Sequence, residues 1–194
     1  NLWRNNRQTT TNHTQTVSKH MRKATGLILS IILFFTISCN NKPIEPFELS
    51  IADYNYSLAY SLLYQLSNEK LTIIFRGELE NEKDSILYTT TKFPKDRIRQ
   101  LADINIDSLN VLYSNVCIKD GDIKSFQFTK NGKSKSVSLQ NYYHAELSSA
   151  IEIINGIIPE KYKMHFEKDK LIKKMEDCGE FQIIKSWEDN NDGK

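Results

Sequence analysis

Two histidines between Cys39 and Lys194 have the side chains that best suit acid–base chemistry. His144 stands at a predicted strand-to-helix junction, and His165 lies where apolar and polar residues alternate. An imidazole can act as a general base or a metal ligand because it titrates near neutral pH. Neither histidine has a serine or cysteine partner in a recognisable sequence motif. We therefore expect His144 to be a polar residue near a helix start and His165 to face the polar side of a strand.

The segment Asp120-Gly121-Asp122 places two carboxylates in one tight loop. Calcium-binding loops use similar spacing, but they need more oxygen ligands and a distal glutamate. Because only this fragment is present, we interpret the segment as a turn. The chain also lacks the spacing of a zinc site and the glycine-rich loop of a phosphate site. The sequence therefore predicts no catalytic residue, no metal and no cofactor. A hydrolase that combines His144 with Asp120 or Asp122 is the alternative hypothesis.

The chain has three cysteines, Cys39, Cys117 and Cys178. Cys117 and Cys178 do not belong to a Cys-x-x-Cys motif, so a thioredoxin-like activity has no support. An exported protein meets an oxidising environment in which these two thiols can pair. The sequence does not show that they meet in space, so a disulfide and two free thiols both remain open.

Cys39 follows a segment that is typical of a secretory signal peptide. Two positive charges in Met21-Arg22-Lys23 precede an apolar core over 26–37, and the small Ser38 comes just before the cysteine. The apolar core is too short for a comfortable membrane span, since about 20 residues are needed to cross roughly 30 Å of hydrocarbon. An uncleaved anchor and a plain signal peptide with a chance cysteine are the alternatives to a lipid-modified Cys39.

The end of this segment, Thr36-Ile37-Ser38-Cys39, resembles the lipobox of bacterial lipoproteins, and it departs from the usual pattern in having Thr36 in place of leucine. The resemblance to small Bacteroidota lipoproteins implies that the Cys39 thiol carries a diacylglyceryl group and that the chain is cut before it. Asn40-Asn41 lacks both the aspartate of inner-membrane retention and the acidic run of surface export. The resemblance therefore implies an outer-membrane anchor facing the periplasm, and it supplies no activity.

These features divide the chain into five parts. We predict an upstream non-domain segment (1–20), a lipoprotein signal peptide (21–38), a lipidated tether (39–46), a single domain (47–187) and a disordered polar tail (188–194). The part from Cys39 onward has 156 residues, enough for one domain with a sizeable core. It carries 21 basic and 24 acidic residues, a net charge of −3, which gives no electrostatic case for a nucleic-acid partner.

The hydrophobic pattern predicts strands and two main helices. Tyrosine or leucine fills every even position from Tyr54 to Leu66, and mostly polar residues fill the odd positions. This alternation favours one long strand with a bend or bulge, followed by a hairpin partner over 71–77. Asn131-Gly132 predicts a tight turn that places Phe126 opposite Val137 on one apolar face. Helices are predicted from Pro94 and over 145–158, with a shorter one near 168–177, and 162–166 alternates as a strand. The fold class is α+β, an antiparallel sheet built from hairpins with two main helices packed on one face.

The adjacent aromatic residues before the second main helix are a candidate binding surface. Tyr142 and Tyr143 must point to opposite faces if they lie in a strand, so at least one of them is expected to be exposed beside His144. Exposed tyrosines are enriched at protein interfaces. We therefore predict a non-catalytic binding or accessory module, for example an inhibitor or immunity-type protein, with an envelope protein or glycan as its partner. The alternative is a periplasmic hydrolase whose site is assembled from distant residues.

Overall fold

The computed structural model describes residues 43–55, 60–77, 79, 81–118 and 121–186. The chain divides into two compact units, Asn1–Pro43 and Ile44–Lys194, and the account below concerns the second. The predicted signal peptide, Cys39 and the predicted tail lie outside the described residues. None of the helices in the described part is both long and apolar enough to cross a membrane.

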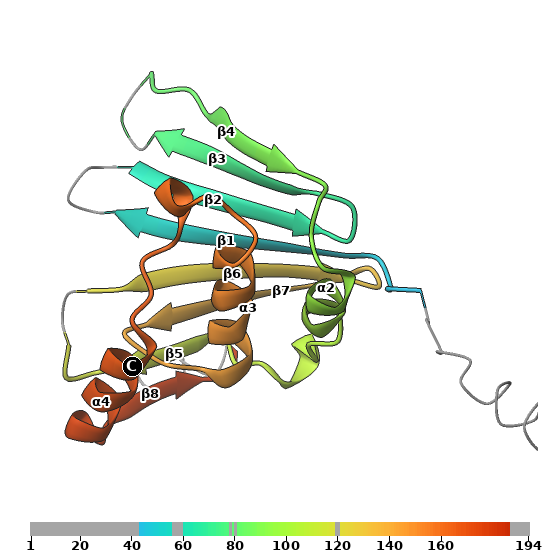
Figure 1. The fold of residues 1–194 in the computed structure, drawn as a ribbon. Helices are drawn as coiled ribbons and strands as arrows, with labels where there is room; N and C mark the ends of the chain where they lie inside the picture. Colours follow the sequence, from blue (N-terminus) through green and yellow to red (C-terminus); the bar gives the residue numbers. More distant parts are fainter. Residues whose placement is uncertain (1–42, 56–59, 78, 80, 119–120, 187–194) are drawn as a thin grey trace, which may run out of the picture. The chain divides into compact units, whose positions relative to one another are not determined.

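The described residues form an eight-stranded sheet in the order β4-β3-β2-β1-β6-β7-β5-β8 (Figure 1). The strands are β1 (Phe47–Asn55), β2 (Tyr60–Ser67), β3 (Leu71–Gly77), β4 (Ser85–Thr90), β5 (Leu112–Asn115), β6 (Ile123–Lys130), β7 (Lys133–Gln140) and β8 (Phe181–Ile184). The predicted α+β class is confirmed, but the sheet is mixed, because β5 pairs in parallel with β7 while the other strand pairs are antiparallel.

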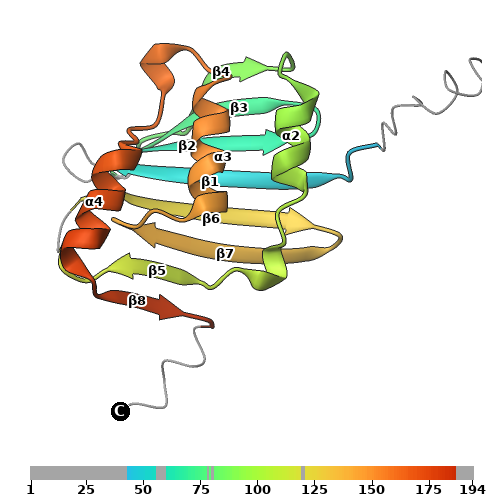
Figure 2. The same cartoon turned by 60° about the horizontal axis from the view of Figure 1, so that its bottom comes forward.

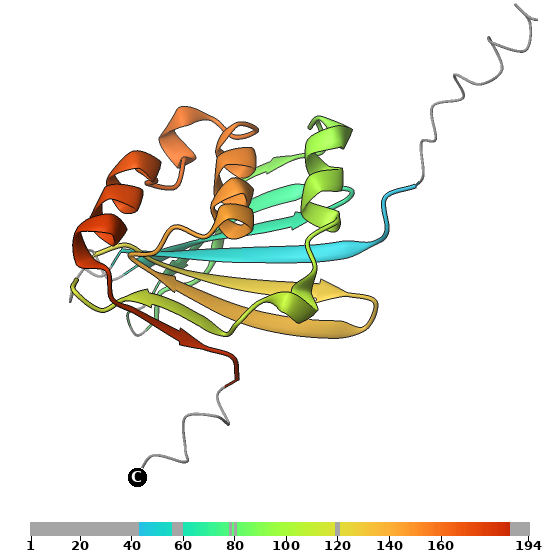
Figure 3. The same cartoon turned by 90° about the horizontal axis from the view of Figure 1, so that it is seen from below.

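Three α-helices accompany the sheet: α2 (Lys95–Ala102), α3 (Ala145–Asn155) and α4 (Lys168–Cys178). Short 3-10 turns lie at η1 (Ile106–Ser108) and η2 (Glu160–Tyr162). The ribbons of α2, α3 and α4 lie on one side of the sheet, with α2 and α4 at its two ends (Figures 2 and 3). The prediction treated the helix near 168–177 as shorter than the two main ones, but α4 and α3 both have 11 residues.

Side chains of the strands and of α2 and α3 share one apolar core. Its fully buried members include Leu49 and Ile51 of β1, Tyr64 of β2, Ile98 of α2 and Ile154 of α3. The apolar residues of the two helices recur at three- and four-residue steps, so each helix presents one stripe to the sheet. Packing of these stripes, rather than helix propensity, is the main stabilisation of such short helices.

The predicted hairpin at Asn131-Gly132 is confirmed. The pair joins β6 to β7 with φ of 53° at Asn131 and 75° at Gly132, the left-handed conformation that a tight hairpin turn requires at both positions. Phe126 lies opposite Val137 in this register, and both side chains are buried. Turn chemistry and hydrophobic alternation therefore specify the same register.

The prediction of one long strand over 54–66 is wrong, since the chain reverses between β1 and β2. Asn55 lies opposite Tyr60 in the antiparallel ladder, and residues 56–59 lie outside the described part. The core-facing side chains are at odd positions in β1, such as Ile51, and at even positions in β2, such as Tyr64. A single strand keeps one parity on each face, so this change of parity requires a break in the strand.

The predicted strand over 162–166 is also absent, because Tyr162 ends η2 and residues 163–166 follow it outside any helix or strand. The alternation was read correctly in one respect, because Met164 is buried and His165 is exposed. The backbone N–H and carbonyl of Met164 form hydrogen bonds with the side chain of Asn155, not with a neighbouring strand. Its N–H donates to Asn155 Oδ1 and its carbonyl accepts from Asn155 Nδ2, both at 2.9 Å. One amide side chain thus satisfies the polar groups that a sheet would otherwise pair.

Candidate functional site

A cavity of about 480 Å³ lies where the ends of β1 and β6 meet α4 and the segment that follows η2. Three parts of the described chain supply its charged residues. Asp53 comes from β1, Asp122 from the residue before β6, and the remaining charged groups come from residues 161–174. Pockets that bind small molecules have volumes of about 300–1,000 Å³, so this cavity has the size of a ligand site.

The charged centre of the site is Lys124, which is 1% exposed. Its Nζ donates to Asp53 Oδ1 at 3.0 Å and also to Asp122 Oδ1. A buried ammonium without partners is very costly, and here two carboxylates compensate it. Both aspartates line the cavity, and Lys124 binds their carboxylates without itself lining it; these three residues are called the charged floor below.

The strand register creates this ion pair. Asp53 lies directly opposite Lys124 in the antiparallel ladder of β1 and β6, and the neighbouring pair on the same face is Ile51 with Phe126. The pair therefore continues the core-facing row of the sheet to its end, where apolar neighbours give way to charge. Cross-strand partners of opposite charge stabilise one another at this distance.

Asn141 fixes the third member of the floor. Its side-chain Oδ1 accepts from the N–H of Asp122 at 2.9 Å, and its own N–H donates to the carbonyl of Asp122 at 2.8 Å. Gly121 has a φ of 144°, and a Cβ there would lie 2.2 Å from Asn141 Oδ1. Only glycine fits this close approach. The predicted turn at residues 120–122 thus positions Asp122, while Asp120 lies outside the described residues.

Burial raises the pKa of Asp53 above its usual range. The ammonium of Lys124 opposes this effect, and the nearby carboxylate of Asp122 adds to it. Carboxyl groups with a raised pKa in a cleft are a recognised sign of functional sites, although structural ion-pair networks also produce them.

The rim of the cavity carries four lysines, Lys161, Lys163, Lys170 and Lys174. Two of them have acidic partners outside the floor. Lys163 pairs with Glu160 at 2.6 Å, and Lys170 pairs with Glu167 at 2.9 Å. Glu167 also lies 3.2 Å from Nε2 of the exposed His165.

The other two rim lysines differ. The ammonium of Lys161 lies 4.6 Å from the ring centre of Tyr162, in a cation–π arrangement. No carboxylate of the described residues lies within 4.0 Å of the ammonium of Lys161 or Lys174.

Three hydrogen bonds from neighbouring elements hold the segment that carries Lys161 and Lys163. The hydroxyl of the buried Tyr64 donates to the carbonyl of Tyr162 at 2.8 Å, and Asn155 binds the backbone of Met164 as described above. These contacts fix the extended residues between α3 and α4 to the sheet and to α3. They explain how the short turn η2 and the residues that follow it keep Lys161 and Lys163 at the cavity.

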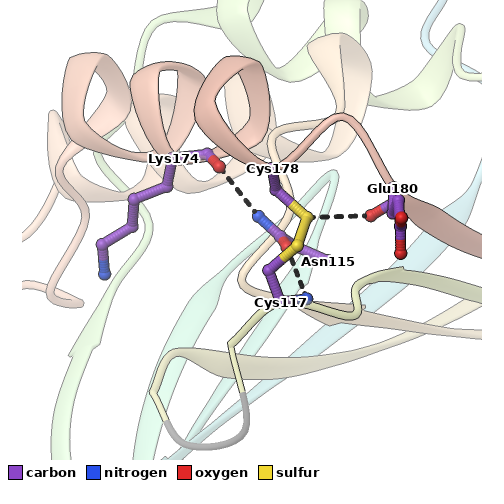
Figure 4. The surroundings of a disulfide bond; sticks show 5 residues. All are labelled: Asn115, Cys117, Lys174, Cys178 and Glu180. Atoms are coloured by element: carbon purple, nitrogen blue, oxygen red, sulfur yellow. Dashed lines mark hydrogen bonds between the residues drawn. A yellow bond between two sulfur atoms is a disulfide. The ribbon is translucent and has the colours of Figure 1, made fainter.

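A disulfide between Cys117 and Cys178 holds α4 beside β5 (Figure 4). The two Cα atoms are 5.9 Å apart, within the range of such bonds. Of the two possibilities that the sequence left open, the structure has the disulfide. The buried Asn115 adds a second connection, because its Nδ2 donates to the carbonyl of Lys174 at 3.2 Å. The helix that supplies Lys170 and Lys174 to the cavity is therefore fixed at its end by a covalent bond.

The structure places Tyr142, Tyr143 and His144 at the start of α3, and none of the three lines the cavity. His144 is the N-cap of α3, and its Nδ1 accepts from the N–H of Leu147 at 3.4 Å. This is the polar helix-start role that the sequence predicted. Burial lowers the pKa of His144, and Glu146 partly offsets the effect.

The two tyrosines have different neighbours. The ring of Tyr142 lies 5.5 Å from the ring of Tyr113 and 5.5 Å from that of Phe181, whereas the ammonium of Lys168 lies 5.3 Å from the ring of Tyr143. Both tyrosines are half-buried. The alternative catalytic set of His144 with Asp122 is not brought together in the cavity, since only Asp122 lines it.

A second hollow of about 320 Å³ is lined by a mixture of polar residues, such as Ser50 and Arg76, and apolar residues, such as Leu63 and Val111. Its one charged wall residue, Arg76, is exposed, so this hollow has no counterpart to the Lys124 floor. No group of three or more potential metal ligands occurs among the described residues. Comparisons with family models, with curated proteins and with solved structures found no match to this chain.

Sequence reasoning missed Asp53 and Lys124 as a pair. One signal was available, because the hairpin register puts Lys124 on the same face as Phe126 and Phe128. A lysine on the apolar face of a strand needs a buried partner. That partner, Asp53, is 71 residues away in the sequence, and only the pairing of β1 with β6 identifies it.

Proposed function

We propose that this chain is a binding module of the cell envelope and that the cavity above Lys124 is its ligand site. The observation that carries the proposal is the burial of Lys124 between Asp53 and Asp122 at the cavity floor. A buried ion pair is weak support for stability, because apolar residues of similar volume often stabilise a fold as well or better. A ligand-binding role gives a reason for keeping Lys124, Asp53 and Asp122 beside the cavity, where stability alone does not.

The composition of the wall supports a ligand of mixed character. Leu62 and Leu171 provide apolar surface, and charged groups surround them on the floor and rim. Binding sites commonly combine such surface with a few fixed polar groups that orient the ligand. The disulfide and the hydrogen bonds of Asn115 and Asn155 support a wall that keeps its shape before the ligand arrives.

The location of the module belongs to the same proposal. We infer that Cys39 carries the lipid and that the domain faces the periplasm from the outer membrane, on the basis of the lipobox-like residues Thr36–Cys39. We also infer that the two main helices, α2 and α3, pack on the same face of the sheet, since both contribute to one core. In the inhibitor or immunity-type version, the occupant of the cavity is a segment of an envelope protein or a glycan.

A pair of variants in α4 tests the site. Lys170 and Lys173 are both exposed, but only Lys170 lines the cavity. The mature protein and its K170W and K173W variants are incubated with envelope extract, washed and denatured, and the released molecules are identified by mass spectrometry. We expect the wild type and K173W to retain the same ligand and K170W to lose it. Equal retention by K170W and K173W, with both variants folded, contradicts the proposal.

The second candidate is a periplasmic hydrolase. One observation favours it, namely that burial raises the pKa of the cavity carboxyl Asp53, as a general acid requires. The chemical state of the retained molecule after incubation distinguishes the two hypotheses. A binding module releases the molecule chemically unchanged after long incubation, whereas a hydrolase converts it and loses that conversion in D53N.

A further inference from the structure

We propose that the ligand of this cavity is a small organic anion, whose phosphate or carboxylate group is bound by Lys161 and Lys174. This inference rests on the proposed function and names its ligand class. It follows from the distribution of charge among the described residues of the cavity, from the positions of the two lysines and from the apolar part of the wall.

The charges of the cavity do not balance one another. Five lysines, Lys124 and the four of the rim, stand against four carboxylates, those of Asp53, Asp122 and Glu167 and that of Glu160, the partner of Lys163. Asp53 and Asp122 both bind Lys124, and Glu167 binds Lys170. The local excess is positive, although the chain from Cys39 onward has a net charge of −3. The cavity therefore attracts an anion locally, whereas the net negative charge of the rest of the domain repels it.

Lys161 and Lys174 approach the cavity from different elements. Lys161 belongs to η2, and Lys174 belongs to α4. The carbonyl of Lys174 is held by Asn115, and its side chain extends away from the disulfide (Figure 4). No described carboxylate lies within 4.0 Å of either ammonium, so both are available to an anionic group. Two cations from separate elements can contact one phosphate or carboxylate from two sides.

The size and the apolar wall distinguish a small organic anion from an inorganic ion. A bare phosphate or chloride would leave most of the 480 Å³ cavity unfilled. Leu62 and Leu171 offer surface to the carbon body of a ligand. The ligand chemistry is thus a carbon skeleton of metabolite size that bears at least one acidic group.

Glucose 6-phosphate, citrate and glucose are suitable probes, because the first and last differ only in the phosphate. Each is titrated into the ¹⁵N-labelled mature protein in detergent, and amide shifts and affinities are measured by NMR. We expect at least one of the two anions to shift amides of residues 161–174 and glucose to leave them unchanged. The affinity for the anion should fall as salt is raised, since exposed charges are screened.

The K161Q/K174Q double variant should weaken binding of the anion by about tenfold, as expected for the loss of two partly exposed ionic contacts. The matched control is K92Q/K95Q, which removes two exposed lysines near the start of α2 and should bind like the wild type. Equal affinity of both double variants, or failure of both anions to bind, overturns the inference. If glucose binds in the cavity as well as its phosphate, the anion class is wrong while the proposed binding site stands. Equal ligand retention by K170W and K173W in the capture experiment would instead contradict the proposed binding site itself.

Discussion

Asp53 and Lys124 face each other across the β1–β6 ladder, and the Lys124 Nζ lies 3.0 Å from Asp53 Oδ1. The two residues are 71 positions apart in the sequence. Their pairing places a charged contact at the end of a row of apolar side chains, where the cavity begins. This contact links the strand order of the sheet to the chemistry of the candidate site.

Replacing Asp53 by asparagine should change the pH dependence of stability. The pKa of Asp53 is raised above 3.8 on folding, chiefly by burial, so the folded state holds this proton more tightly than the unfolded chain does. The contribution of Asp53 to the free energy of unfolding therefore falls as pH rises from about 3.8 through the folded pKa. Urea denaturation at several pH values measures this contribution as the wild-type value minus the D53N value. A difference that grows with rising pH would show that the pKa is lowered instead.

His144 should titrate below its ordinary pKa of 6.5, because burial disfavours the imidazolium. Protonation would also remove the Nδ1 acceptor that caps α3. A group whose pKa is lowered on folding destabilises the folded state as pH falls below the unfolded value, here 6.5. An NMR titration of the His144 ring gives the midpoint directly. H144N keeps an N-cap acceptor and should lack this pH-dependent loss of stability. A midpoint at or above 6.5 contradicts the prediction.

Removal of the disulfide should loosen α4. The bond joins residues 61 positions apart, and in the chain-entropy model such a closure stabilises the folded state by roughly 4 kcal/mol. C117S/C178S should therefore unfold at lower urea concentration, with faster amide exchange in Lys168–Cys178 than the wild type shows. Reductant should reproduce the loss in the wild type and have no effect on the double variant. Unchanged exchange in α4 would show that Asn115 and packing hold this helix without the bond.

The sequence predicted those parts of the fold that depend on neighbouring residues. Asn131 and Gly132 suit positive φ, and alternation on each side of them agrees with the turn, so the β6–β7 hairpin was predictable. The parallel pairing of β5 with β7 was not, because β5 is short and its partner is chosen by tertiary packing.

The candidate site was less predictable than the fold. Each charged residue of the cavity is unremarkable in its own segment, and the site arises only where β1, β6 and the residues after η2 converge. His144 attracted attention because histidine suits catalysis, yet it caps a helix. Lys124 was the informative residue, since it occupies a core-facing position of β6.

Lipid modification of Cys39 has a direct test in mass spectrometry. The protein extracted from membranes should begin at Cys39 and carry acyl chains on that residue. Two or more chains anchor a protein stably, whereas one gives only marginal binding. C39A should lack the modification and should no longer be cleaved at this place. A mature protein that starts elsewhere, or one that keeps the apolar segment 26–37, would contradict the prediction.

The central claim is that the cavity above Lys124 is where this protein binds its ligand. The most direct measurement is NMR mapping of the ¹⁵N-labelled mature protein during addition of the small-molecule fraction of envelope extract. The account predicts that the shifted amides include Asp53, Asp122 and residues 161–174. Shifts confined to residues 142–144, or to the hollow around Ser50, would place the binding site elsewhere and contradict the account.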